Sequence, residues 1–320
     1  MLKVATLSRW HVHADEYAEK FQSFENVKLV AHWDENPEEG KPFAAKYNME
    51  FEPDLDKLLS RSDIDAVCLN APTNRHKEII VKAANSGKHI FTEKVMALTN
   101  AESAEIKEAI EKNGVKFCIS FPHRTWSHNL FAKKIVEENL LGKISYIRTR
   151  NAHSGASAGW LPSHFYDKKE CGGGAMIDLG AHPMYLILWL LGLPDEISST
   201  FTSVTGHEVE DNAVCTMKYP NGLIAVSETS FVTSDSPKVL EIHGTEGSIV
   251  IVEDKIWSLS EKIKEPFDMP KPLPDAVTQF INGIIKNEKI IFDLNEAIDL
   301  TKIMEAAYKS HEKGGFVKVV

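Results

Sequence analysis

Asp178 and His182 are the residues whose types and spacing best suit acid–base chemistry. On a helix, residues four apart share a face, so the carboxylate could orient the imidazole and raise its basicity. Pro183 leaves two arrangements open: a helix kinked at the proline, or one that begins near it, with Asp178 in the preceding loop. The run Gly172–Gly174 just upstream permits close approach of a ligand to the backbone. A hydrogen-bonded core pair is the alternative without chemistry.

A second group of polar residues ends apolar runs in the first third of the chain. Asp34 follows Leu29–Trp33, Asn70 ends a later run, and Glu93 and Lys94 end another. The carboxyl ends of parallel strands form the ligand edge of a doubly wound sheet. We therefore expect a ligand there, although a solvated ion pair is the simpler explanation of a Glu-Lys dipeptide.

Asp34 favours one kind of ligand. A carboxylate at the end of the second strand can accept hydrogen bonds from an adenosine ribose, and it repels a 2′-phosphate. If a dinucleotide binds, NAD is therefore favoured over NADP. The alternative is an aspartate that only starts the turn before Asn36 and Pro37.

The turn after the first predicted strand lacks the glycines of a dinucleotide fingerprint, and the first glycine of the chain is Gly40. The free N–H groups of a helix N-terminus can still bind an anion, and Ser8, Arg9 and His11 could add donors. His11 and His13 suggest a metal, but two histidines without a third ligand are weak support. We predict no metal.

A strand–helix alternation over residues 1–120 must position these side chains. Short runs rich in Val, Ile or Phe, bounded by turn residues, predict strands. These are Val4–Leu7, Val27–Trp33, Ala66–Asn70, His89–Thr92 and Phe117–Ser120. Helices between them end at Gly87 and Gly114, and the second begins with the capping box Thr99–Glu102. The alternation predicts an α/β fold with a Rossmann-type, doubly wound parallel sheet.

The pattern changes in residues 121–320. Helices are expected at Trp126–Leu141 and Met176–Leu191, with the strand Ile144–Asn151 between them. From residue 197 to 259 only strands follow, separated by glycine-containing turns. Consecutive strands after a helix predict an α+β domain with a large open, mainly antiparallel sheet.

Composition and charge exclude several classes of protein. The 320 residues are 43% hydrophobic and 26% charged, which rules out a mainly disordered chain. The formal net charge of −10 repels a polyphosphate backbone, so we expect no nucleic-acid partner. Without a membrane-length apolar run or a signal-peptide pattern, we expect no membrane partner and a cytoplasmic protein. The four cysteines are too far apart for a zinc ribbon or a redox pair.

At the candidate site residues and the sequence around them, the chain resembles the glucose-fructose oxidoreductase and inositol dehydrogenase family, Gfo/Idh/MocA. Four blocks carry the resemblance, in the family's order and along nearly the full length. They are Asp63–His76, Ala84–Lys94, Gly172–Gly192 and Glu241–Gly247, and the tail Ala306–Gly314 also matches. Two features depart from the pattern: the fingerprint glycines are absent, and Val95 replaces the proline of Glu-Lys-Pro.

The resemblance implies an NAD(P)-dependent oxidoreductase whose open sheet makes a homo-oligomer, dimer or tetramer. It places Lys94 beside the reacting carbon and the nicotinamide, makes His182 the acid/base for the substrate hydroxyl, and has Asp178 position both. The expected cofactor contacts are Ser8, Arg9, His11, Asp34, Asn70, Ala71, Pro72, Thr73, His76, Glu93, Lys94 and Arg124.

The loop from residue 151 to 164 precedes the candidate catalytic residues, and in the family such loops line the substrate site. His153, Trp160 and His164 are therefore expected to contact substrate together with Lys94, Asp178 and His182. Polar groups beside an aromatic ring suit a polyol, because the ring stacks on C–H groups while the polar groups bind hydroxyls. The expected substrate is a secondary hydroxyl of a sugar, cyclitol or related polyol.

Two other functions stay open. The missing glycines are compatible with a non-catalytic module that senses a cofactor or another ligand. Alternatively, transient oxidation by bound NAD could acidify a neighbouring C–H bond for elimination or epimerisation without net oxidation.

Overall fold

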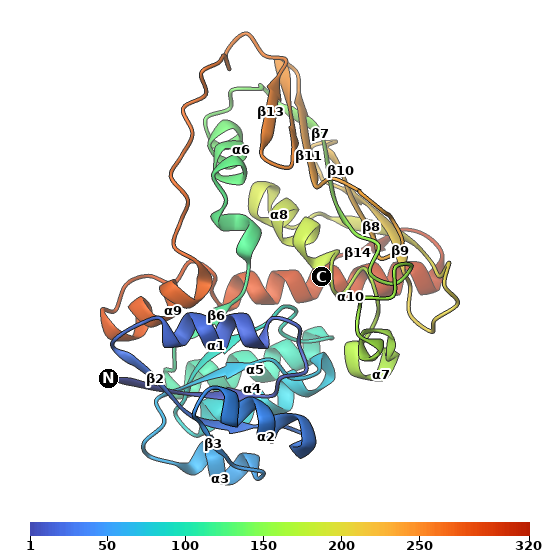
Figure 1. Ribbon diagram of the computed structural model, residues 1–320. Helices are drawn as coiled ribbons and strands as arrows, with labels where there is room; N and C mark the ends of the chain where they lie inside the picture. Colours follow the sequence, from blue (N-terminus) through green and yellow to red (C-terminus); the bar gives the residue numbers. More distant parts are fainter. The chain divides into compact units, whose positions relative to one another are not determined.

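The computed structural model describes residues 1–320 and contains two compact units, and many of their elements are labelled in Figure 1. The first unit comprises residues 1–120 and 274–298, and the second comprises residues 121–273 and 299–320. The segment 274–298, which follows residue 120 by a long stretch of sequence, therefore folds with the first unit. Each unit is built on its own sheet.

The first unit holds a six-stranded sheet in the order β3-β2-β1-β4-β5-β6, with every pairing parallel. Its strands are β1 (Leu2–Leu7), β2 (Val27–Trp33), β3 (Glu50–Phe51), β4 (Ala66–Leu69), β5 (His89–Thr92) and β6 (Phe117–Ile119). All four residues of β4 are buried, as expected of a strand covered on both faces. The doubly wound sheet predicted from the sequence is confirmed.

Helices flank this sheet. They are α1 (Ala14–Gln22), α2 (Pro37–Lys46), α3 (Leu55–Ser60), α4 (His76–Asn85), α5 (Asn100–Asn113), α9 (Ala276–Ile285) and the short 3-10 helix η1 (Thr73–Arg75). The expected capping box is present: the Glu102 N–H donates to Thr99 Oγ1 at 3.2 Å, and the Glu102 carboxylate accepts from the Thr99 N–H. The helix α9 packs on β5 and β6 through Phe280, which contacts Phe21 and Phe91.

The second unit holds an eight-stranded sheet in the order β13-β12-β11-β7-β10-β9-β8-β14. Its strands are β7 (Ile144–Ala152), β8 (Glu196–Thr202), β9 (Asn212–Lys218), β10 (Ile224–Ser230), β11 (Val239–Gly244), β12 (Gly247–Val252), β13 (Lys255–Ser258) and β14 (Val317–Lys318). Only β7 and β10 pair in parallel, so the expected mainly antiparallel sheet is confirmed.

One face of this sheet is covered. The helix α8 (Ala181–Leu191) packs against β7 and β10. The remaining helical elements of this unit are α6 (Ser127–Glu137), α7 (Lys168–Cys171), η2 (Pro122–Thr125), η3 (Ser163–Tyr166) and most of α10 (Leu294–Lys313). On β9 the side chains of Ala213, Cys215 and Met217 are buried, while Val214 on the other face is 43% exposed.

The start of α8 corrects the sequence prediction. The helix begins at Ala181, not at Met176, and the residues before it form turns in which the Asp178 N–H donates to the Gly174 carbonyl at 3.1 Å. Pro183 is the third residue of the helix, where its missing N–H would have no intrahelical partner. Asp178 and His182 therefore do not share a helix face, and Asp178 lies in the loop that leads into α8.

None of the helices is both long enough and apolar enough to cross a bilayer.

Candidate functional site

The carboxyl ends of the first unit's strands gather polar residues at one edge of the sheet. The order of the strands reverses between β1 and β4, and ligands of open α/β sheets bind at such a switch point. The residues that follow the strand ends are Ser8, Asp34, Asn70, Glu93, Lys94 and Ser120. The sequence-predicted cofactor residues Ala71 and Pro72 follow Asn70 and are buried, and Thr73 opens η1.

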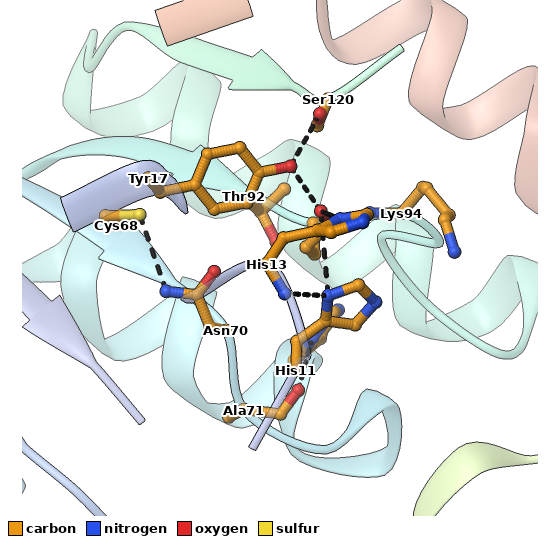
Figure 2. Close-up of polar contacts among 11 residues, drawn as sticks. His11, His13, Tyr17, Cys68, Asn70, Ala71, Thr92, Lys94 and Ser120 are labelled. Atoms are coloured by element: carbon orange, nitrogen blue, oxygen red, sulfur yellow. Dashed lines mark hydrogen bonds and ion pairs between the residues drawn. The ribbon is translucent and has the colours of Figure 1, made fainter. Parts of the chain in front are cut away.

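Glu93 is the centre of this group, and Figure 2 shows the side chains of Tyr17, His13 and Ser120 from the same region. Its carboxylate is 2% exposed; Oε1 accepts from the Tyr17 hydroxyl and lies 2.8 Å from His13 Nδ1, and Oε2 accepts from the Lys94 N–H at 2.9 Å. The Tyr17 hydroxyl also lies 2.8 Å from Ser120 Oγ. The Tyr17 hydroxyl thus ties α1 to the residues that follow β5 and β6.

The charges around Glu93 control its ionisation. Burial alone would raise the pKa of Glu93, but His11, His13 and Lys94 outweigh burial and hold the pKa well below its ordinary value. Burial likewise lowers the pKa of His13, and the hydrogen bond and charge of Glu93 reverse this effect and raise it above 6.5. The site therefore contains a buried carboxylate compensated by cations and donors.

His76 fixes the backbone on both sides of this edge. Its ring nitrogens lie 2.9 Å from the Ala71 carbonyl and 2.8 Å from the Val95 carbonyl, and burial lowers its pKa. The peptide bond between Lys94 and Val95 is cis. Asn70 donates to Cys68 Sγ at 3.6 Å, while its Oδ1 is buried without a partner.

Asp34 holds two turns together. Its Oδ2 accepts from the Arg9 N–H at 2.9 Å and its Oδ1 from the Asn36 N–H at 2.8 Å, so the aspartate does start the turn before Pro37. The neighbouring Glu35 was not among the sequence-predicted residues. Its Oε1 accepts from the Ser8 hydroxyl at 2.8 Å.

Glu35 supplies an unused acceptor oxygen, Oε2, whereas both carboxylate oxygens of Asp34 already accept from backbone N–H groups. Glu35 Oε2 is buried without a hydrogen-bond partner, and burial followed by the charge of Asp34 raises the pKa of Glu35. The sequence signal was available, because Glu35 is the second of two consecutive carboxylates at the end of β2. An orphaned acceptor at this strand end fits a ribose hydroxyl.

The turn between β1 and α1 adopts a left-handed backbone conformation at Ser8 although it contains no glycine. Ser8 has a φ of 68°, and its N–H donates to the Trp33 carbonyl at 2.6 Å. Such a left-handed conformation costs about 1 kcal/mol for an L-residue, which hydrogen bonds here offset. The helix α1 then begins at Ala14 with no side-chain cap, so its N–H groups fit an anion. The Arg9 guanidinium, expected as a cofactor donor, pairs with Glu39.

A different arrangement surrounds His182 in the second unit. His182 is the second residue of α8, and its Nδ1 lies 2.9 Å from the Tyr185 hydroxyl, which accepts from the His123 N–H at 3.0 Å. The His182 ring stacks on His123 with centroids 4.2 Å apart, and His123 stacks on Trp126 at 3.9 Å. Packing and hydrogen bonding therefore fix the imidazole in one orientation.

The His153 and Trp160 rings also lie together in this unit. The His153 ring stacks on Phe231 with centroids 5.1 Å apart and lies 4.6 Å from the Trp160 ring. Burial lowers the pKa of His153, and the charge of Asp178 opposes this effect. Trp160 is 58% exposed, which leaves an indole face available to a ligand.

Two predicted residues have structural contacts. His164 lies in η3, and its carbonyl accepts from Cys171 Sγ at 3.3 Å. Arg124 is 4% exposed, and its guanidinium lies 4.9 Å from the centroid of the Trp189 ring. Neither contact requires a ligand.

Two glycines of the run, Gly173 and Gly174, have a packing reason. A Cβ on Gly173 would lie 1.9 Å from the Tyr308 hydroxyl, and a Cβ on Gly174 would lie 2.0 Å from the Glu210 carbonyl oxygen. The Glu210 carboxylate accepts from Tyr308 at 2.6 Å and from the N–H groups of Gly174 and Met176 at 3.0 and 2.9 Å. Burial raises the pKa of Glu210. The glycines thus allow the loop to close on Glu210 and Tyr308.

Comparisons with known proteins match both units. Residues 11–121 match an oxidoreductase family described as having an NAD-binding Rossmann fold, and residues 130–250 match the GFO/IDH/MocA C-terminal domain. A levoglucosan dehydrogenase, solved with NADH and L-sorbose, shares the fold with a TM-score of 0.86 at 20% identity, over 100% of this chain and 99% of that one.

Two curated relatives differ in activity. The 2,7-anhydro-N-acetylneuraminate hydratase of Mediterraneibacter gnavus is 28% identical over 71% of this chain, which covers 61% of that protein. The scyllo-inositol 2-dehydrogenase (NADP(+)) of Bacillus subtilis is 25% identical, over 92% of this chain and 93% of that protein. The chain spans less than two thirds of the length of several curated relatives that it matches.

Proposed function

The chain belongs to the Gfo/Idh/MocA family of oxidoreductases, and on that premise we propose that it is an NAD-dependent dehydrogenase. It transfers a hydride between nicotinamide and a secondary hydroxyl of a sugar, cyclitol or related polyol. The observation that carries the proposal is the set of polar residues at the carboxyl ends of β1, β2, β4 and β5, where the sheet order reverses.

The residues of this chain divide the work of alcohol oxidation. When bound, the nicotinamide supplies the hydride acceptor. His182 takes the hydroxyl proton through Nε2, since its Nδ1 is engaged by the Tyr185 hydroxyl. The Lys94 ammonium stabilises the developing alkoxide. Asp178 positions substrate and imidazole.

We propose NAD rather than NADP as the cofactor. Asp34 and Glu35 put two carboxylates at the end of β2, where a 2′-phosphate would meet negative charge. Two nearby arginines that could bind such a phosphate are already paired: Arg9 with Glu39, and Arg75 with Glu78 at 3.3 Å. Thr73 and Asn70 contribute further polar groups at this edge.

The loop over residues 151–164 is proposed to bind the substrate. The Trp160 indole offers an apolar surface to the C–H face of a ring, and His153 and His164 offer polar groups. The hydratase activity of one relative supports a second candidate, in which transient oxidation of the same substrate class leads to elimination without net oxidation.

We also propose that the chain works in the cytoplasm as a homo-oligomer formed through the second unit's sheet. The face opposite α8 exposes Val214, Ile224 and Trp257 by 42 to 50%. An apolar sheet face of this kind is stabilised by a second copy. A light-scattering mass equal to one chain would contradict this part of the proposal.

A polyol screen tests the function. Purified protein is incubated with NAD and a panel of sugars, anhydrosugars and inositols, while NADH absorbance and products are followed. The dehydrogenase predicts NADH equal to the oxidised product. Elimination or epimerisation predicts a new product with no net NADH. A folded protein that binds no dinucleotide would instead favour a sensing module.

A further inference from the structure

We propose that His11, His13 and Glu93 form a binding site for one divalent transition-metal ion, of which zinc is the model. One nitrogen of each histidine and one carboxylate oxygen all lie within 4.8 Å of one another. The sequence offers no third ligand beside the two histidines. The fold supplies Glu93 from the end of β5, next to the turn between β1 and α1.

The ligand atoms already lie close together. His13 Nδ1 lies 2.8 Å and His11 Nδ1 lies 3.8 Å from the same oxygen, Glu93 Oε1, and the two imidazole centroids are 4.7 Å apart. Ligands of a tetrahedral zinc ion are roughly 3.3 Å from one another. To reach this spacing, the His11 ring must move toward Glu93 Oε1 from 3.8 Å, and the His13 ring, which is 37% exposed, must move slightly away from 2.8 Å.

The His11 nitrogen is in the state that a metal needs. The His13 backbone N–H donates to His11 Nδ1 at 3.3 Å, so this nitrogen is unprotonated, and a metal ion would take the place of that hydrogen bond. The 2.8 Å separation of His13 Nδ1 from Glu93 Oε1 fits one hydrogen-bonded proton between these two atoms. A divalent ion replaces that proton and satisfies the carboxylate with two imidazoles at once.

Groups around the cluster hold the carboxylate in place. Tyr17 donates to Glu93 Oε1, and the Lys94 N–H donates to Oε2 at 2.9 Å. Such outer hydrogen bonds orient metal-binding carboxylates and raise affinity. Two imidazoles and one carboxylate are a ligand set of zinc sites that keep one position open, and imidazole does not suit magnesium or calcium.

The open position faces the accessible side. The side chains of His11 and Glu93 are 6% and 2% exposed, whereas that of His13 is 37% exposed. The fourth ligand is therefore a water molecule or an oxygen of a small molecule that enters past His13. The inference does not depend on the proposed dehydrogenase, because a metal titration needs no dinucleotide.

The test is a titration of chelator-treated protein with Zn²⁺ in competition with a chromogenic chelator, and with Co²⁺ followed by its visible absorption. The wild type is expected to bind one ion per chain. His13→Gln and Glu93→Gln are expected to weaken binding by at least about 10- to 100-fold, the loss caused even by removing outer partners. Circular dichroism of the metal-free variants verifies folding.

A matched control is His89→Gln. His89 is half-buried at the opposite end of the same strand, β5, and is expected to leave Zn²⁺ affinity unchanged. If Glu93→Gln does not fold, the partly exposed His13 decides the outcome. The proposal is overturned if the wild type binds no ion, if His13→Gln binds like the wild type, or if His89→Gln loses as much affinity.

Discussion

The two sets of candidate residues are organised by opposite physical means. In the first unit a buried carboxylate, Glu93, is held by donors and cations from α1 and from the backbone after β5. In the second unit the imidazole of His182 is held by stacked rings and by the Tyr185 hydroxyl. The first arrangement depends on charge compensation, and the second depends on ring stacking and a hydrogen bond. The same kind of substitution should therefore have different consequences in the two units.

The largest effect is expected from removing the groups proposed to act on the hydroxyl. Lys94→Met and His182→Ala should each reduce kcat by about 10²- to 10⁴-fold, because each loses a group that acts in proton transfer or charge stabilisation. Steady-state kinetics with the best polyol of the screen gives the ratio, and a melting curve verifies folding. Full activity in both folded variants would refute their roles.

Removal of the Glu93 carboxylate tests charge compensation directly. Glu93→Ala leaves the Tyr17 hydroxyl, the His13 ring and the Lys94 N–H without their acceptor. We expect a loss of about 3 kcal/mol in the free energy of unfolding, measured with urea on metal-free protein. Glu93→Gln keeps one carbonyl oxygen and should lose less. Equal losses in the two variants would show that volume, not hydrogen bonding, is what matters.

Glu210 provides the same test in the second unit. Glu210→Ala removes the acceptor of Tyr308, Gly174 and Met176 and should cost about 2 kcal/mol. Glu210→Gln retains the oxygen and should be close to the wild type. Urea unfolding of both variants at neutral pH makes the comparison.

Glu210 should also impose a pH dependence. Burial raises its pKa above 4.5, so the folded chain binds this proton more tightly than the unfolded chain does. The contribution of this group is therefore most favourable at acidic pH and is lost as the pH rises through the raised pKa. Glu210→Gln should remove that part of the slope, and an unchanged slope would contradict the assignment.

The smallest effect is expected at Tyr185, which positions His182. Tyr185→Phe removes two hydrogen bonds, one with His182 Nδ1 and one from the His123 N–H, and keeps the ring that packs on Phe121 at 4.4 Å. A loss of about 1 kcal/mol corresponds to a roughly fivefold lower kcat. KM should stay near its wild-type value, while the melting temperature should fall modestly because the buried His123 N–H loses its acceptor. A change confined to stability would give Tyr185 a structural role only.

The parts of the site that follow a strand could be predicted from the sequence. Continuous apolar runs defined the strands, and the sheet topology then placed Asp34, Asn70 and Glu93 at a single edge. The predicted start of α8 was wrong because Pro183 is compatible with two helix boundaries. The division of the chain at residue 120, and the roles of the site residues, stay predictions.

Partners that come from distant elements were not predictable. Tyr17 and Glu93 are 76 residues apart, His123 and Tyr185 are 62 apart, and Glu210 and Tyr308 are 98 apart. No spacing rule connects residues at such separations, because only the packed fold brings them together. Glycines 173 and 174 illustrate this, since their small size is explained by Tyr308 and Glu210, neither of which lies near them in the sequence.

The central claim is that this glycine-free first turn still binds NAD. A thermal-shift titration of purified, nucleotide-free protein with NAD, NADH, NADP and NADPH tests it most directly, because a ligand at 100 times its Kd stabilises the folded state by about 2.7 kcal/mol. The account predicts a raised melting temperature with NAD and NADH and little change with the phosphorylated forms. No shift with any of the four, or a shift only with NADP and NADPH, would contradict it.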